Sequence, residues 1–171
     1  MIFGHLINKY IYIFIVGIEI KYIAPLVAYV SISMSHDSEF NQWWDNAGKW
    51  YSDNGIDRNQ FSTFPFSNGI NKGDILIVKG VNYDEIKVGD IIVFWSERKD
   101  PIAHRVTKKW EENGVYFFQT KGDNYKTNYV PIKSTVLDET KIPQAKVIGV
   151  VNKRIPKIGW LKINYVEFLN T

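Results

Sequence analysis

The sequence predicts a mainly-β fold, in which an antiparallel β domain follows one N-terminal transmembrane helix and a short helical insertion. Three observations support this: a long apolar stretch near the N-terminus, a helical stripe of aromatic residues after it, and short β-branched runs separated by turns in the remainder. With 171 residues, the chain can form one domain with its own core plus a membrane segment. We divide it into an anchor (8–31), a linking segment with the insertion (32–61), a β-rich domain (62–163) and a tail (164–171).

The composition excludes several kinds of site. Cysteine is absent, which removes disulfides, cysteine nucleophiles and cysteine-based zinc sites, and the three histidines are too few for a histidine-rich metal centre. The net charge of +3, from 21 basic and 18 acidic residues, is too balanced to indicate nucleic-acid binding. We therefore expect no cofactor, no metal and no nucleic-acid partner.

The apolar stretch runs from Tyr10 to Met34 and is interrupted by only two charged residues, Glu19 and Lys21. About 20 residues cross the hydrocarbon layer of a bilayer as a helix, so this stretch is long enough. Each charge near a helix centre costs about 2.5–3.5 kcal/mol on insertion, which leaves open an apolar helix packed on a soluble domain. We favour a membrane span over residues 8–31, with the lipid bilayer as a partner.

The flanking charges predict how this span is oriented. Lys9 precedes the apolar stretch, whereas the next charges after it are acidic, beginning with Asp37 and Glu39. Basic residues favour the cytoplasmic side. We expect a single-pass protein of the cell membrane with a cytoplasmic N-terminus and the β-rich domain on the outer face. A cleaved secretory signal fits less well, because its apolar region is typically about 7–15 residues.

An aromatic stripe predicts a helix over residues 36–54. Phe40, Trp43, Trp44 and Ala47 follow the i, i+3, i+4, i+7 spacing of one helix face, and Asn54-Gly55 is a stop signal. This face could pack on the domain or lie at a membrane surface, where tryptophan is common. The sequence leaves both interpretations open.

After Phe66 the pattern changes to short apolar runs bounded by turn residues. No regular alternation of strands and helices is present, so a compact antiparallel domain is expected. The last stretch, Trp160–Thr171, is too short to span a membrane and is either a surface-lying tail or a final strand. The predicted strands cover residues 75–78, 91–95, 103–110, 115–120 and 145–151 with its flanks.

Three segments carry residues suited to nucleophilic chemistry. Ser31 and Ser33 lie where the apolar span meets water, His104 lies inside a predicted strand, and Asp123 lies in a Gly-Asp-Asn turn. A serine nucleophile needs a base within hydrogen-bond reach, and that base needs an acceptor on its other nitrogen. Taken singly, each of these segments is ordinary for a helix end, a strand or a turn.

Short motifs follow one another along residues 23–163. They are Ser-Ile-Ser-Met (31–34), Lys-Gly-Asp-Ile-Leu-Ile-Val (72–78), Val-Gly-Asp-Ile-Ile-Val-Phe (88–94), Pro-Ile-Ala-His-Arg-Val (101–106), Thr-Lys-Gly-Asp-Asn (120–124), Ile-Gly-Val-Val (148–151) and Ile-Pro-Lys-Ile-Gly (155–159). In this order they resemble signal peptidase I. His-Arg stands where the bacterial branch has Lys-Arg, which makes the chain similar to the archaeal and endoplasmic-reticulum branch, understood to use Ser and His.

The resemblance implies a membrane-bound serine endopeptidase that removes N-terminal signal peptides from exported proteins. Carried over by motif, Ser33 is the nucleophile, His104 the general base and Asp123 the acidic partner, while Ser31 and the backbone N–H of Ser33 stabilise the oxyanion. Preprotein signal peptides and the protein-export machinery are the implied partners.

Several departures from the family pattern leave alternatives open. Ile32 replaces a glycine, residues 35–72 are an insertion, and no second Asp follows Gly-Asp-Asn closely, so Asp138 or Glu139 could serve as the acid. Within the insertion, Ser62 is a rival nucleophile, but only Ser33 directly follows the apolar span. A catalytically silent, membrane-anchored binding protein and a generic β-barrel ligand-binding module are the competing interpretations.

Overall fold

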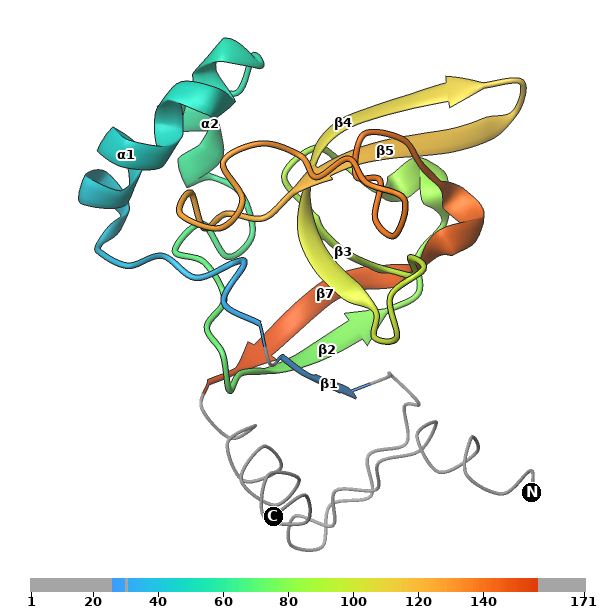
Figure 1. Cartoon of the computed structure of the whole chain (residues 1–171), viewed down its shortest axis with the longest axis horizontal. Coiled ribbons are helices and arrows are strands. Elements are labelled where there is room, and N and C mark those ends of the chain that lie inside the picture. Colours follow the sequence, from blue (N-terminus) through green and yellow to red (C-terminus); the bar gives the residue numbers. More distant parts are fainter. Residues whose placement is uncertain (1–25, 30, 157–171) are drawn as a thin grey trace, which may run out of the picture.

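The computed structural model describes residues 26–29 and 31–156, and within them seven strands form one antiparallel sheet (Figure 1). The strand order is β1-β2-β7-β3-β4-β5-β6, and helices are few, as the sequence predicted. The elements are β1 (Leu26–Ala28), α1 (Phe40–Asp53), α2 (Arg58–Ser62), β2 (Ile75–Lys79), the 3-10 turn η2 (Tyr83–Glu85), β3 (Ile91–Phe94), β4 (Ile102–Glu112), β5 (Val115–Lys121), β6 (Ile142–Pro143), the 3-10 turn η3 (Gln144–Lys146) and β7 (Val147–Ile155).

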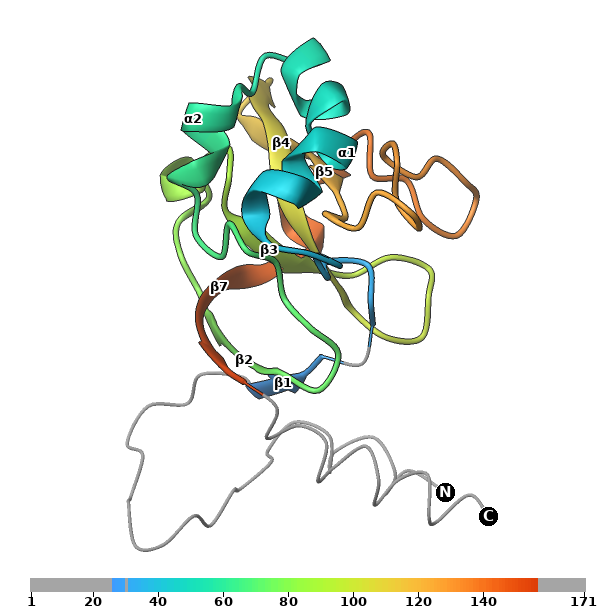
Figure 2. The same cartoon turned by 90° about the vertical axis from the view of Figure 1, so that its left-hand side faces the viewer.

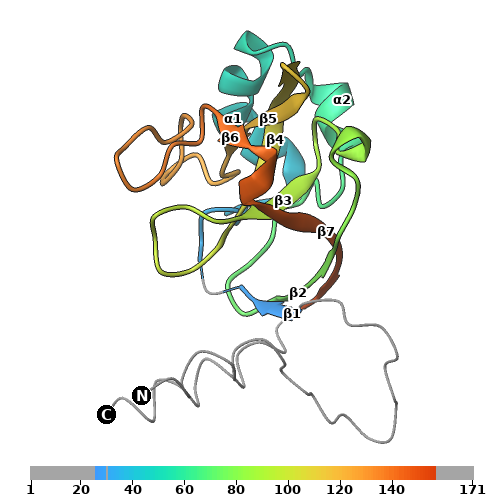
Figure 3. The same cartoon turned by 90° about the vertical axis from the view of Figure 1, so that its right-hand side faces the viewer.

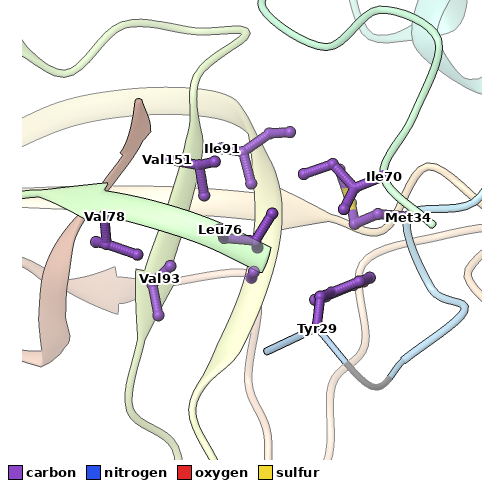
Figure 4. Close-up of a cluster of buried hydrophobic side chains, with 9 residues drawn as sticks. Tyr29, Met34, Ile70, Leu76, Val78, Ile91, Val93 and Val151 are labelled. Atoms are coloured by element: carbon purple, nitrogen blue, oxygen red, sulfur yellow. The ribbon is translucent and has the colours of Figure 1, made fainter. Parts of the chain in front are cut away.

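Strand β3 lies at the centre of the sheet and is buried on both faces. Successive side chains of a strand point to opposite faces, so Ile91 and Val93 join one apolar cluster while Ile92 and Phe94 join another. The first cluster also contains Leu76 from β2, and Figure 4 shows its side chains gathered around that strand. Figure 2 and Figure 3 show how β2 and β7 curve at one end of the domain.

The two Gly-Asp pairs that precede β2 and β3 are equivalent turns. Gly73 and Gly89 have φ of 91° and 100°, a conformation that favours glycine. In each turn the next residue, Asp74 or Asp90, accepts a hydrogen bond on its carboxylate from the backbone N–H three residues earlier, at 2.9 and 2.8 Å. The repeated motif therefore marks two strand starts and not a repeat architecture.

The predicted span 8–31 needs a correction at its C-terminal end. Residues Leu26–Ala28 form strand β1, which pairs antiparallel with β2, so a helix does not extend through them. Pro25 directly precedes this strand, and proline is unfavourable in a helix interior. The rest of the predicted anchor, and the tail from residue 157 onward, lie outside the described residues. Among the described residues, no helix has the length and apolar character needed to cross a membrane.

The aromatic stripe packs on the domain. Helix α1 lies inside the predicted range 36–54, and its Trp43 and Tyr51 are fully buried together with Phe61 of α2, a helix that the sequence did not predict. Figure 1 and Figure 2 place both helices at the end of the domain opposite β1 and β2. The indole N–H of Trp43 donates to the Asp123 carbonyl at 3.2 Å, which links α1 to the turn after β5.

Trp43→Ala should destabilise the protein strongly, because it removes a hydrogen bond and a buried ring that contacts five other aromatic rings, including the His36 imidazole. We expect a loss of about 3–5 kcal/mol in the free energy of unfolding, measured by chemical denaturation. Trp95→Ala is the control, since Trp95 is 49% exposed and should cost about 1 kcal/mol or less. Equal losses in the two variants would contradict this packing.

Candidate active site

His104 connects a serine and a carboxylate in one line. Its Nε2 lies 2.7 Å from Ser33 Oγ, and its Nδ1 lies 2.5 Å from Glu139 Oε1. Strand β4 holds the backbone of His104 opposite Ile92 of the central strand β3, and the residue is 3% exposed. The arrangement has the order expected of a nucleophile, a base and an orienting acceptor.

The segment that carries Ser33 is fixed by the Gly-Asp-Asn turn after β5. The backbone N–H of Asn124 donates to the Ser33 carbonyl at 2.9 Å, and the Asn124 side-chain amide donates to the Ile32 carbonyl at 3.0 Å. A Cβ at Gly122 would lie 2.6 Å from the same Ser33 carbonyl, so only glycine fits there without movement. This turn therefore positions the nucleophile segment through the backbone.

The Ser33 hydroxyl contacts two further hydroxyl groups. Tyr29 OH lies 2.9 Å from Ser33 Oγ, and the Ser31 hydroxyl donates to Ser33 Oγ at 3.1 Å. Ser31 Oγ also accepts the Ser33 backbone N–H at 3.1 Å. Ser31 is exposed, whereas Tyr29 is buried. The two donors that the resemblance implied for an oxyanion, Ser31 Oγ and the Ser33 N–H, are thus adjacent.

Glu139 is fully buried and held by three hydrogen bonds. Beyond His104, it accepts the Thr120 hydroxyl on Oε1 at 2.8 Å and the Ile132 backbone N–H on Oε2 at 2.9 Å. Burial acts to raise the pKa of this carboxyl, but the neighbouring His104 and the hydrogen bonds outweigh burial and lower it below its ordinary value. Glu139 is therefore a carboxylate at neutral pH, able to accept the His104 Nδ1 proton and to stabilise an imidazolium.

Asp123, the acid that the resemblance implied, forms an ion pair with Arg105, and the carboxylate bonded to His104 is that of Glu139. Arg105 Nη2 donates to Asp123 Oδ2 at 2.6 Å, and Tyr51 OH donates to Oδ1 at 2.9 Å. All three side chains are fully buried. Burial acts to raise the pKa of Asp123, but the Arg105 guanidinium outweighs it and holds this pKa well below its usual range. Asp123 is a structural ion-pair partner in this geometry.

The remaining donors of Arg105 join loops to this pair. Nη1 donates to the carbonyls of Pro65 and Gly89, each at 2.8 Å, and Nη2 donates to the Phe66 carbonyl at 3.0 Å. The imidazole of His36 stacks on Trp43 and brings its Nε2 to 3.5 Å from Asp123 Oδ2. The pair thus links β4, the insertion and the turn before β3.

The structure also places the two remaining candidates. Ser62 ends α2, is exposed, and donates to the Asn59 carbonyl at 2.7 Å. Asp138 is exposed and accepts hydrogen bonds from the N–H and hydroxyl of Thr140. Among the described residues, no group of three or more His, Cys, Asp or Glu side chains could hold a metal ion. The sequence predicted Ser33 and His104 as nucleophile and base, and it named Glu139 as an alternative acid. It did not predict Tyr29, because a tyrosine within an apolar stretch carries no distinctive signal.

The chain is similar to catalytic subunits of the signal peptidase complex. It is 35% identical over 95 residues to signal peptidase complex catalytic subunit SEC11C of Homo sapiens, which covers 54% of this chain and 48% of that protein. It is 32% identical over 94 residues to the sec11 subunit of Dictyostelium discoideum, 54% of this chain and 51% of the relative. It is 30% identical over 118 residues to the sec11 subunit of Schizosaccharomyces pombe, which covers 57% of this chain and 60% of that relative.

These matches support the signal peptidase family. The chain spans about half the length of the curated relatives that it matches. No family model matches the chain.

Asp123→Asn should destabilise the protein, because it leaves the fully buried Arg105 guanidinium without its counter-charge. Breaking one partner of a buried pair typically costs about 3–5 kcal/mol, which we expect in the free energy of unfolding from denaturant titration. Asp53→Asn is a matched control, since Asp53 pairs with Lys49 on the exposed face of α1 and should cost less than about 1 kcal/mol.

The same pair predicts a sign for the pH dependence of stability. The pKa of Asp123 is lower in the folded chain, so its contribution is present at neutral pH and is lost as pH falls below about 4. The Asp123→Asn variant should lose less stability than wild type over this acid range, measured by thermal unfolding at a series of pH values. Parallel acid profiles would contradict the ion pair.

Proposed function

We propose that this protein is a membrane-bound serine endopeptidase that removes N-terminal signal peptides from exported proteins. The observation that carries the proposal is the line from Ser33 through His104 to Glu139, with contacts of 2.7 and 2.5 Å. The similarity to signal peptidase complex catalytic subunits supports the substrate class. Ser33 is the nucleophile and His104 the general base of the proposed reaction.

The first step transfers one proton and forms one bond. Neutral His104 accepts the Ser33 hydroxyl proton on Nε2 as Ser33 Oγ bonds to the carbonyl carbon of the scissile peptide, and the carbonyl π electrons move to its oxygen. The imidazolium that forms keeps its Nδ1 proton on the Glu139 carboxylate. Glu139 therefore stabilises the charge that the step creates on His104.

The oxyanion formed in this step needs donors at the mouth of the site. The Ser33 N–H and the Ser31 hydroxyl are adjacent, and the exposed Ser31 side chain is free to turn toward an incoming carbonyl. Hydrogen bonds from such donors stabilise the charge that develops on the oxyanion. His104 then returns its proton to the leaving amine nitrogen, and water, activated by the same His104, hydrolyses the acyl-enzyme to free Ser33.

Two strand edges could hold an extended substrate. Strand β1 is outermost in the described sheet and leads directly to Tyr29 and Ser33. At the start of β4, Ile102–His104 pair with β3 on one side only, because pairing with β5 begins at Arg105. Main-chain hydrogen bonds from such edges bind a peptide as an added strand.

The membrane location is part of the proposal. Residues 8–25 are apolar apart from Asn8, Lys9, Glu19 and Lys21, and their length is close to the lower limit of about 17 residues for a span. We propose that they anchor the chain in the cell membrane with a cytoplasmic N-terminus. This location would bring the nucleophile, which follows shortly after, close to the outer surface where a signal peptide emerges.

Ser33→Ala and His104→Ala should each abolish cleavage of a preprotein by the full-length protein in detergent. The expected loss of turnover is about 10³- to 10⁶-fold, because nucleophile and base act as one unit. Ser62→Ala is the control and should cleave at the wild-type rate. Cleavage that survives in Ser33→Ala would contradict the assignment and favour a binding role or a different nucleophile.

Glu139→Gln should lower turnover by about 10²- to 10⁴-fold, because an amide is a poor acceptor for the imidazolium and permits the wrong His104 tautomer. Asp138→Asn is a matched control, since this neighbouring carboxylate is exposed and bonded to Thr140. Its turnover should stay within about 2-fold of wild type. Measuring kcat for both variants, with melting temperatures to verify folding, checks the prediction; reversed effects would exclude Glu139 as the acid.

A further inference from the structure

We propose that Tyr29 is a catalytic residue that donates a hydrogen bond to Ser33 Oγ, directs the seryl proton onto His104 and stabilises the negative charge that develops on this oxygen. The proposal rests on the proposed function, and it adds Tyr29 to the two groups, His104 and Glu139, that activate Ser33. Its basis is the 2.9 Å contact between the two oxygens, in a site where Ser33 Oγ also lies 2.7 Å from the base.

The backbone and the core fix the phenol of Tyr29 in place. The Tyr29 N–H donates to the Asp74 carbonyl and the Tyr29 carbonyl accepts the Gly73 N–H, both at 2.8 Å, so the Gly-Asp turn before β2 holds this residue on both sides. The side chain is 5% exposed and belongs to the cluster that includes Met34 and Ile70 (Figure 4). The hydroxyl is therefore presented to Ser33 by a rigid support.

Counting protons gives the direction of the hydrogen bond. A serine hydroxyl has one proton to donate and two lone pairs to accept with. When the Nδ1 proton of His104 is held by Glu139, Nε2 is an acceptor and takes the Ser33 proton. Ser33 Oγ then accepts from Tyr29 and from Ser31, which uses its full capacity. In this arrangement the seryl proton has one destination, the base.

The two donors on Ser33 Oγ differ in what they can do during the reaction. Attack on a carbonyl requires one Ser33 lone pair, so one donor must leave. Ser31 is exposed and can turn to the oxyanion, whereas Tyr29 is buried and stays. Burial also raises the pKa of Tyr29 to about 12, which keeps its proton available as a donor at neutral pH.

A serine-directed fluorophosphonate tests Tyr29 without a peptide substrate. Ser33 Oγ attacks phosphorus, fluoride leaves and the seryl proton passes to His104, so the labelling rate reports the reactivity of the nucleophile. The full-length protein in detergent is labelled at several probe concentrations and followed by intact mass spectrometry. The maximal rate constant is thereby separated from the concentration that gives half of it.

Tyr29→Phe should lower the maximal labelling rate constant by about 10- to 100-fold, the range for one hydrogen bond to a charged oxygen, with the half-saturating concentration within about 2-fold. Tyr125→Phe is the matched control: it removes a tyrosine hydroxyl that bonds to Asp37 and not to Ser33, and it should label at the wild-type rate. A protein with 3-fluorotyrosine at position 29 keeps the shape of the side chain and its hydroxyl donor. Its maximal labelling rate constant should be at least about one third of the wild-type value.

Labelling of Tyr29→Phe at the wild-type rate would overturn the proposal, as would slow labelling of the 3-fluorotyrosine protein or no labelling of wild type at Ser33. Should Tyr29→Phe fail to fold, slow labelling of the folded fluorotyrosine protein would still overturn the proposal. The outcome is separable from the proposed function. If wild type is labelled at Ser33 but cleaves no preprotein, the proposed function is wrong and the Tyr29 comparison is still valid. If wild type cleaves the preprotein but Tyr29→Phe is labelled as fast as wild type, only the role of Tyr29 is wrong.

Discussion

The buried ion pair between Arg105 and Asp123 is the constraint on which the geometry of the site depends. Taking two charges out of water costs several kcal/mol per ion, so a pair of this kind persists only where its hydrogen bonds are well satisfied. Here Arg105 also donates to three backbone carbonyls, and Asp123 also accepts from Tyr51. Because Asp123 lies in the turn that holds the Ser33 carbonyl, and Arg105 follows His104 on β4, one interaction fixes the backbones of nucleophile and base together.

The two buried carboxylates have separate physical roles. Both have a lowered pKa despite burial, but they have different partners: Asp123 faces the Arg105 guanidinium, whereas Glu139 faces the His104 imidazole. A permanent ion pair supports structure, and a carboxylate beside the proposed general base supports proton transfer. The long segment between β5 and β6 brings Glu139 back to Thr120, where its second oxygen is held by the backbone of Ile132.

The sequence was sufficient for elements with a strong local signal. The aromatic stripe predicted α1, and the Gly-Asp turns predicted the starts of β2 and β3. The order of the motifs predicted that Ser33 and His104 act together, and the structure places them in contact. The sequence could not place contacts that depend on the path of a long loop. It therefore assigned Asp123 as the acid and kept Glu139 only as an alternative, whereas the structure brings Glu139 to His104 and Asp123 to Arg105. The sequence also extended an apolar run as a helix through Leu26–Ala28, because strand pairing with β2 is a tertiary effect that hydropathy does not contain.

The most direct test of this account is the environment of the His104 Nδ1 proton. A proton shared between an imidazole and a buried carboxylate gives a far-downfield resonance in the proton NMR spectrum of the full-length protein in detergent. We expect such a resonance in wild type, its loss in Glu139→Gln and His104→Ala, and its persistence in Asp138→Asn. An unchanged resonance in folded Glu139→Gln would show that another group holds His104, and would contradict the Ser33–His104–Glu139 arrangement.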